Sequence, residues 1–204
     1  MIRAYAVALL FLLCSVLAVG SAAAASGDDA RQFVDNLGQR VLAVVNGSGG
    51  ENEKQAQLKA MFSDNVDMDW MGKFVVGQGW RQATEDQRTH YLQAYKNYLL
   101  THYTTNFADY TGSKYTITDV KNEEGGQFIV GMQIKNPNGQ QQDIVAGYRV
   151  REEGGKFKIV DIIVEGVSLI TTQRSDFSAT LQQKGMDGLI SAIEAKTNAE
   201  SGAK

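Results

Sequence analysis

The sequence predicts an α+β domain in which helices come first, a small antiparallel sheet follows, and two helices close the chain. Apolar residues recur at helical spacing before residue 110, and a period of two runs from residue 114 to residue 165. Short glycine-containing turns interrupt that period, and such turns connect antiparallel neighbours. We therefore expect a small curved antiparallel four-stranded meander packed against several helices, with an apolar cavity between the layers.

The first 25 residues have the pattern of a secretory signal peptide. A lone cation, Arg3, precedes an apolar stretch of 16 residues from Ala4 to Val19, and small residues ending in Ala23-Ala24-Ala25 follow. A membrane-spanning helix needs roughly 20 apolar residues, so this stretch is short for an anchor. We expect cleavage after Ala25, which leaves one domain over residues 26–204.

The composition of that domain excludes several classes. The one cysteine, Cys14, lies in the signal peptide, so the mature chain can form neither a disulfide nor a cysteine metal site. The full chain carries a net charge of −3, and loss of Arg3 makes the mature charge −4. An acidic chain without a basic run argues against binding to nucleic acid.

Four helices are expected before the sheet. The most distinct is the last, where Thr84 and Gln87 form a capping-box pattern ahead of an aromatic stripe. The aspartates Asp64 and Asp67 are interpreted as helix-start residues rather than metal ligands, since no calcium-loop pattern surrounds them. The expected helices cover residues 28–45, 51–62, 66–76 and 84–110.

Four strands follow, and alternation assigns their faces. In the third, Ala146 and Tyr148 point inward while Arg149 and Arg151 point outward. The fourth is apolar on both faces, so its inward face stays ambiguous. The expected strands cover residues 114–122, 127–135, 142–152 and 156–165, and the closing helices cover residues 171–184 and 187–196.

Candidates for catalysis are few. His90 and His102 are twelve residues apart on one expected helix, which places them about 18 Å apart, too far to share a metal ion. No zinc-protease, phosphate-loop or nucleophile-elbow motif occurs. We therefore predict no catalytic residue, no metal site and no cofactor. The apolar residues on the inward faces of the expected helices and strands fit either a filled core or a lined cavity, because their periodicity is the same in both cases.

Four stretches together resemble one family. They are F-V-D-N-L-G-Q-R-V-L at 33–42, G-K-F-V-V-G-Q-G-W-R at 72–81, L-Q-A-Y-K-N-Y-L-L-T-H-Y-T-T-N-F at 92–107, and D-I-I-V-E-G-V-S-L-I-T-T-Q-R-S-D-F at 161–177, followed by G-M-D-G-L-I at 185–190. In order and spacing they resemble the MlaC family, also called the toluene-tolerance auxiliary family. Thr172-Gln173 departs from the pattern, because an aromatic residue often precedes the arginine.

The resemblance implies a non-enzymatic lipid carrier in the Gram-negative periplasm. Its cargo would be a phospholipid, held as cargo rather than as a cofactor. Its partners would be an inner-membrane ABC-transporter complex with its substrate-binding subunit and an outer-membrane lipoprotein and porin complex, and its role would be to maintain outer-membrane lipid asymmetry. Three alternatives stay open: a hopanoid carrier, a periplasmic adaptor with a filled core, and an isomerase of small apolar substrates on a cone-shaped α+β fold, for which His102 or Asp161 would have to face inward.

Under the carrier hypothesis, two groups of residues line one apolar cavity. They are the strand residues that alternation points inward and the residues on the apolar stripe of the helix over 84–110. We expect Glu165 and Gly166 to end the fourth strand and turn the chain. Glu165 would be held either by a cation, for which Arg174 is a candidate, or by backbone donors. The expected lipid-binding residues are Leu99, Tyr103, Phe107, Val130, Met132, Ile144, Ala146, Tyr148, Ile162, Val164 and Leu169.

Overall fold

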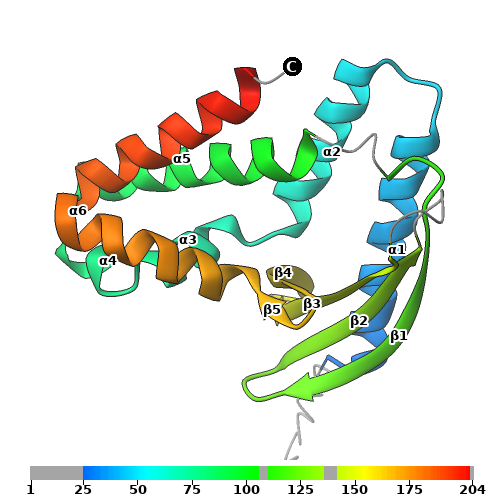
Figure 1. The fold of residues 1–204 in the computed structure, drawn as a ribbon. Helices are drawn as coiled ribbons and strands as arrows, with labels where there is room; N and C mark the ends of the chain where they lie inside the picture. Colours follow the sequence, from blue (N-terminus) through cyan, green and yellow to red (C-terminus); the bar gives the residue numbers. More distant parts are fainter. Residues whose placement is uncertain (1–24, 106–109, 136–141, 203–204) are drawn as a thin grey trace, which may run out of the picture.

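The computed structural model describes residues 25–105, 110–135 and 142–202, and it confirms the predicted α+β class. Figure 1 shows a twisted, curled sheet with a helix along one face and a group of helices extending to one side. The predicted signal peptide lies, apart from Ala25, outside the described residues and stays a prediction.

The first two helices form an antiparallel pair. α1 spans Gly27–Asn46 and α2 spans Glu51–Asn65. A capping box starts α1, because Ser26 accepts a hydrogen bond from the Asp29 amide while the Asp29 carboxylate accepts from the Ser26 amide. α1 packs against β1 and β2, and α2 packs against α5 and β4 (Figure 1). Both helices of the pair therefore pack against the sheet.

α3 spans Met68–Val76, two residues shorter than the predicted helix. Val66 is instead extended and forms an isolated parallel bridge with Ile159, so the helix begins only after Asp67. Asp67 caps it by accepting from the Trp70 amide at 3.0 Å, as predicted for a helix-start residue. Asp64 does not start a helix, since it lies in the last turn of α2. A short helix not predicted from the sequence, α4 (Gln78–Gln82), follows.

α5 spans Glu85–Thr104 and begins with the predicted capping box of Thr84 and Gln87. It ends six residues before the predicted end. Near that end Thr104 and Thr105 both donate to carbonyls one turn back, an arrangement that competes with regular helical geometry. Residues 106–109, which include Phe107, lie outside the described residues, and at Tyr110 the chain is no longer α-helical.

The sheet has five strands where four were predicted, in the order β1-β2-β3-β4-β5 with antiparallel neighbours. The extra strand is short because the chain leaves it at once for α6. β4 ends at Val164, and Glu165 and Gly166 form the turn with φ of 49° and 81°, as predicted for this pair. The strands are β1 (Lys114–Glu123), β2 (Gln127–Lys135), β3 (Ile144–Glu153), β4 (Lys156–Val164) and β5 (Val167–Ser168).

α6 spans Leu169–Gly202 and bends at Gly185, whose φ of 68° and ψ of −170° are not helical. The bend divides it much as the two predicted helices were divided, although its first half begins two residues earlier. Figure 1 shows the first half leaving the sheet and the second returning along α5. No helix in the described part of the chain combines the length and the apolar run that a bilayer crossing requires.

Candidate functional site

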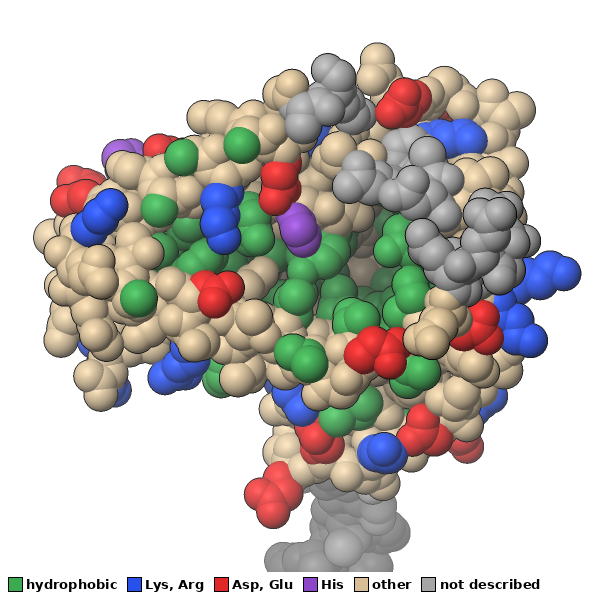
Figure 2. Space-filling view, in the orientation of Figure 1, with side chains coloured by type: hydrophobic (Ala, Val, Ile, Leu, Met, Phe, Trp, Pro, Cys, Tyr) green, Lys and Arg blue, Asp and Glu red, His purple; other side chains and the backbone are tan. Residues whose placement is uncertain are grey.

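An apolar cavity of about 280 Å³ lies between the sheet, the α1–α2 pair and the end of α5. On the face drawn in Figure 2 the molecule is hollowed there, and hydrophobic side chains gather around the hollow. Ligand pockets commonly measure roughly 300–1,000 Å³, so the volume of the cavity lies just below that range. The wall consists of Val34, Leu37, Gly38, Val41, Leu42, Val45, Leu58, Met61, Phe62, Val66, Tyr103, Thr104, Tyr110, Ser113, Lys114, Tyr115, Met132, Ile134, Tyr148, Ile159 and Ile162.

α1 supplies one side of the wall through apolar residues spaced three or four apart, which share one face of a helix. Gly38 lets this face approach the sheet, because a Cβ there would lie 2.8 Å from the ring of Tyr115. The Tyr115 hydroxyl donates to the Asp35 carbonyl at 2.9 Å and ties α1 to β1. The residues on this face are Val34, Leu37, Val41 and Val45.

The sheet supplies the opposite side through cross-strand neighbours. Tyr148 and Ile162 are directly paired, so both side chains stand on the same face. Ile159 is three residues from Ile162 and would face away in a regular strand. A bulge between the pairs Arg149–Asp161 and Val150–Ile159 leaves Val160 as the extra residue and returns Ile159 to the cavity side. This bulge explains why simple alternation left the fourth strand ambiguous.

Most polar residues of the wall come from one stretch of the chain, where α5 leads into β1, and we call this part of the wall the polar end. They include Thr104, Ser113 and Lys114, whereas the wall from α1, α2 and β4 is apolar. The Thr104 hydroxyl already donates to the Leu100 carbonyl. The cavity therefore has an apolar body and one polar end, the arrangement that suits an amphipathic ligand.

Tyr103 differs from Tyr91 and Tyr95 in the hydrogen bonding of its hydroxyl group. The Tyr91 hydroxyl donates to the Gly72 carbonyl at 2.9 Å, and the Tyr95 hydroxyl donates to Gln173 Oε1 at 2.6 Å. The Tyr103 hydroxyl is buried and has no hydrogen-bond partner among the described residues. Leaving such a group unsatisfied costs about 1–3 kcal/mol.

Burial shifts the tyrosine pKa values on this wall. Loss of hydration raises the pKa of Tyr103 far above the usual value for a phenol, with smaller contributions from Tyr98, Asp161 and Glu200. The same cause, with a smaller effect from Tyr110, raises the pKa of Tyr148 to about 12. Both phenols are therefore neutral donors at physiological pH.

The structure brings together only part of the set expected from the sequence. Four members, Tyr103, Met132, Tyr148 and Ile162, lie in the cavity wall. Three others are buried next to it without reaching the wall, namely Leu99, Val130 and Ala146. Ile144 and Leu169 are half-buried outside the wall, Val164 is 40% exposed at the end of β4, and Phe107 lies outside the described residues.

The residues missed by sequence analysis come mainly from α1 and α2. Leu37, Val41 and Phe62 line the cavity, whereas the sequence predicted only that they lie in helices. The signal for them was present in the four-residue spacing of the first helix. That spacing shows which face is buried, and it does not show whether a side chain or an empty space lies opposite.

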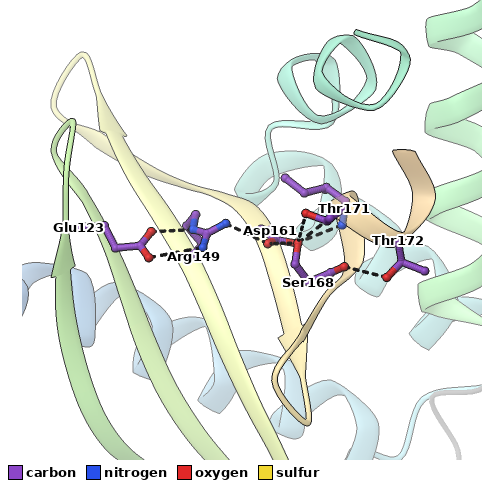
Figure 3. A network of polar contacts seen from close by, with 7 residues as sticks. Glu123, Arg149, Asp161, Ser168, Thr171 and Thr172 are labelled. Atoms are coloured by element: carbon purple, nitrogen blue, oxygen red, sulfur yellow. Dashed lines mark hydrogen bonds and ion pairs between the residues drawn. The ribbon is translucent and has the colours of Figure 1, made fainter. Parts of the chain in front are cut away.

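Asp161 is fully buried at the junction of the sheet and α6, and its carboxylate is already used (Figure 3). Oδ2 accepts from Arg149 at 3.1 Å and from the Ser168 hydroxyl at 2.7 Å, and Oδ1 accepts from the Ile170 amide at 3.2 Å. Asp161 therefore caps the start of α6 and neutralises Arg149. It is absent from the cavity wall.

His102, like Asp161, is absent from the cavity wall. Its Nδ1 lies 3.0 Å from Glu200 Oε1, and its ring stacks on Tyr98, so it joins α5 to the end of α6. The isomerase alternative required His102 or Asp161 to face inward, and neither belongs to the wall. Among the described residues no three histidine, cysteine, aspartate or glutamate side chains come close enough together to hold a metal ion.

The arginines expected to point outward do lie on the face away from the cavity, but solvent does not surround them. Arg149 bonds Glu123 at 2.8 Å as well as Asp161, and its side chain is 24% exposed. Arg151 bonds Asp67 at 2.8 Å and lies over the ring of Trp70. Alternation gave the correct face, but it could not show that α3 and the start of α6 cover that face.

Of the two expected ways of holding Glu165, the backbone donor is confirmed, whereas the candidate pairing with Arg174 is wrong. Glu165 Oε1 accepts from the Val145 amide at 2.8 Å, so a backbone donor at the start of β3 holds it. Arg174 instead donates to the Phe74 carbonyl at 3.1 Å and lies over the Phe74 ring. Glu165 thus fastens the β4–β5 turn to β3, and Arg174 fastens α6 to α3.

Comparison with known proteins points to one family. The family model described as MlaC protein matches residues 23–195. The toluene tolerance protein ttg2D of Pseudomonas putida is 26% identical over 131 residues, which cover 64% of this chain and 60% of that protein. The intermembrane phospholipid transport system binding protein MlaC of Haemophilus influenzae is 21% identical over 131 residues, covering 63% of this chain and 61% of that protein. The matched region thus spans about three fifths of each relative.

A solved structure shares the fold. The phospholipid-binding protein from Ralstonia solanacearum, determined in complex with a phospholipid, superposes with a TM-score of 0.74 at 21% sequence identity. The match covers 84% of this chain and 98% of that one. At this identity the likeness establishes a common architecture.

Proposed function

The chain belongs to the MlaC family, and from that membership we propose that it is a periplasmic phospholipid carrier. One relative is named for intermembrane phospholipid transport, and the structural neighbour was determined with a bound phospholipid. The proposed cargo route runs between an inner-membrane ABC-transporter complex, with its substrate-binding subunit, and an outer-membrane lipoprotein and porin complex. Through it the protein would maintain the lipid asymmetry of the outer membrane.

The observation that carries this proposal is the cavity with an apolar body and one polar end. We propose that acyl chains lie against Met132, Tyr148 and Ile162 on the sheet side and against the apolar face of α1 on the other. Leu99, Val130 and Ala146 would support this wall from behind. The periplasmic location is an inference from the expected signal peptide together with the family.

Burial of the chains supplies the affinity. Each methylene removed from water contributes about 0.8 kcal/mol, so the affinity grows with the length of acyl chain that the cavity buries. A lipid held this way dissociates slowly into water. Release therefore requires a partner that opens the cavity or offers another apolar surface.

Two alternatives make different demands on the cavity. An adaptor with a filled core would have no use for an apolar space of about 280 Å³. A hopanoid carrier would use the same apolar wall, but its rigid rings would fill the body differently from flexible chains. The polar end favours a ligand with a hydrated headgroup, which is why we propose a phospholipid.

Native mass spectrometry of the protein purified from the periplasm tests the proposal. The expected spectrum contains a complex heavier than the polypeptide by the mass of a phospholipid, and extraction of the same sample should release that lipid with its phosphorus. A folded protein that carries no lipid would support the adaptor, and a phosphorus-free polycyclic lipid would support the hopanoid carrier.

A further inference from the structure

We propose that an acyl chain of the bound lipid leaves the cavity along the sheet and lies against Val164 and Val167, two exposed valines at the β4–β5 edge. This inference rests on the proposed carrier function and adds a surface part to the lipid site. Val164 is 40% exposed and Val167 is 60% exposed, and they are two of the four large apolar side chains that are exposed in the described part of the chain.

The two valines continue the cavity wall on one face of the sheet. Met132 of the wall pairs directly with Ala146, and Ala146 pairs with Val164. Val164 in turn pairs with Val167. Directly paired residues point to the same face, and so does Ile162 of the wall, which lies two residues before Val164 on β4. The row is apolar from the wall to the edge of the sheet.

Exposure rises along this row from the cavity to the edge. Met132 and Ala146 are buried, whereas the two valines are open to solvent. β5 has only two residues, and α6 begins directly after it. In Figure 2 further hydrophobic side chains lie below the hollow, toward the end of the sheet at which Figure 1 labels β5. The apolar face of the sheet therefore extends from the cavity to the surface.

The turn between the valines is held in one conformation. Glu165 has a φ of 49°, a left-handed conformation that is costly for a residue with a side chain. Its amide donates to the Val145 carbonyl at 2.9 Å, and its carboxylate accepts from the Val145 amide at 2.8 Å. These two bonds to β3 fix the turn, so the valines on either side of it form a preorganised surface.

The size of the cavity indicates what covers the valines. A volume of about 280 Å³ lies just below the range of pockets that enclose a drug-sized ligand. A phospholipid with two long acyl chains is larger than such a ligand, so part of it must lie outside the cavity. Methylenes outside the cavity are removed from water only where apolar surface is available. Val164 and Val167 supply that surface in continuity with the wall.

The test compares two phosphatidylglycerols that differ only in chain length, one with two decanoyl chains and one with two hexadecanoyl chains. The delipidated full mature chain competes for an equal mixture, and native mass spectrometry gives the long-to-short ratio of the bound lipid. The longer chains place more methylenes outside the cavity. In Val167→Asn this ratio should fall about fourfold relative to the unchanged protein, the factor equivalent to the 0.8 kcal/mol of one buried methylene.

The matched control is Val145→Asn. Val145 is 52% exposed at the same end of the sheet, but its position next to Ala146 in β3 places it on the opposite face. Its long-to-short ratio should equal that of the unchanged protein. Val167→Thr is a second variant that keeps the β-branched shape and replaces one methyl group by a hydroxyl, and it should lower the ratio by a smaller factor.

An unchanged ratio in both Val167 variants would overturn the contact and leave the carrier proposal intact. If those variants were instead slower in passing lipid to a partner complex, the valines would belong to a docking surface for a protein. A fall of the same size in Val145→Asn would also overturn the proposal, because the effect would not depend on the cavity face. Failure of the unchanged protein to bind either lipid would contradict the carrier proposal itself.

Discussion

At the scale of single residues, Asp161 connects the two parts of the molecule. It receives Arg149 from the sheet, the Ser168 hydroxyl from β5 and the Ile170 amide from the start of α6. All three donors would lose their partner together if the carboxylate were removed. The residue that fitted an isomerase on sequence grounds is thus better explained by the architecture.

We expect Asp161→Ala to lower the free energy of unfolding by about 3–5 kcal/mol, since it leaves the start of α6 without its acceptor and the largely buried Arg149 with only the more exposed Glu123. The control is Glu123→Ala, which removes the other carboxylate from the same arginine at a more exposed position. Its cost should be about 1 kcal/mol or less. Urea denaturation measures both, and equal losses would contradict the role given to Asp161.

At this scale, the features that could be predicted from the sequence are those that depend on local backbone conformation. The turn at Glu165 and Gly166 followed from a glycine between two apolar runs, and the capping box of Thr84 and Gln87 followed from local residue types. Side-chain partners could not be predicted in the same way. Glu165 bonds a backbone amide 20 residues earlier in the chain, and Arg174 reaches α3, because tertiary packing decides those contacts.

At the scale of elements, the bend at Gly185 determines the path of α6. Its φ of 68° and ψ of −170° belong to a region that other residues strongly avoid, and no atom lies within 4 Å of the place where its Cβ would be. The requirement for glycine is therefore conformational rather than steric. Without the bend the second half of α6 could not return along α5.

Gly185→Ala should therefore destabilise the protein by about 1–3 kcal/mol. The matched control is Gly202→Ala, on the same helix and also with open space around its Cβ position, where alanine is expected to be neutral or slightly stabilising. Thermal melts of both variants measure the difference. Equal melting temperatures would show that the bend is not conformationally demanding.

The limits of prediction at this scale are physical. The four long strands were predicted to within about two residues, because alternation and turn glycines are local signals. β5 has two residues and α4 has five, too few for a period to be visible. The end of α5 was placed too late, since the aromatic stripe continues while the threonines near Thr104 change the backbone.

At the scale of the whole molecule, burial of tyrosines couples their ionisation to unfolding. Burial raises the pKa of six tyrosines in the folded state, whereas the unfolded chain titrates near pH 10. As the pH rises above about 10 the unfolded state loses protons first, so the free energy of unfolding falls there and is unaffected below. The six are Tyr91, Tyr95, Tyr98, Tyr103, Tyr115 and Tyr148.

We therefore expect most tyrosinate absorbance to develop together with loss of helical circular dichroism above about pH 10. Both signals can be followed in one alkaline titration. Ionisation of most tyrosines near pH 10 with the helical signal intact would contradict the burial described for them.

The molecule as a whole combines a filled half and a hollow half. α3, α5 and α6 pack around Tyr91, Tyr95 and Phe177, while the sheet and the α1–α2 pair leave an apolar space between them. Both halves bury the same kinds of apolar residues, and in both the spacing of these residues shows only which face of a helix or strand is buried. For this reason the spacing of apolar residues predicted an apolar interior, and only the resemblance to the MlaC family indicated a cavity rather than a filled core.

The most direct test of the central claim fills the cavity from its α1 side. Val41→Trp places an indole in the wall, and Ala43→Trp places the same group on an exposed position of the same helix. Phospholipid phosphorus per protein, measured with a thermal melt of the same sample, compares them. We predict that Val41→Trp melts within the range of Ala43→Trp but loses most of its bound phospholipid, which Ala43→Trp retains. A Val41→Trp variant that is folded and still carries a full complement of phospholipid would contradict the claim that this cavity holds the cargo.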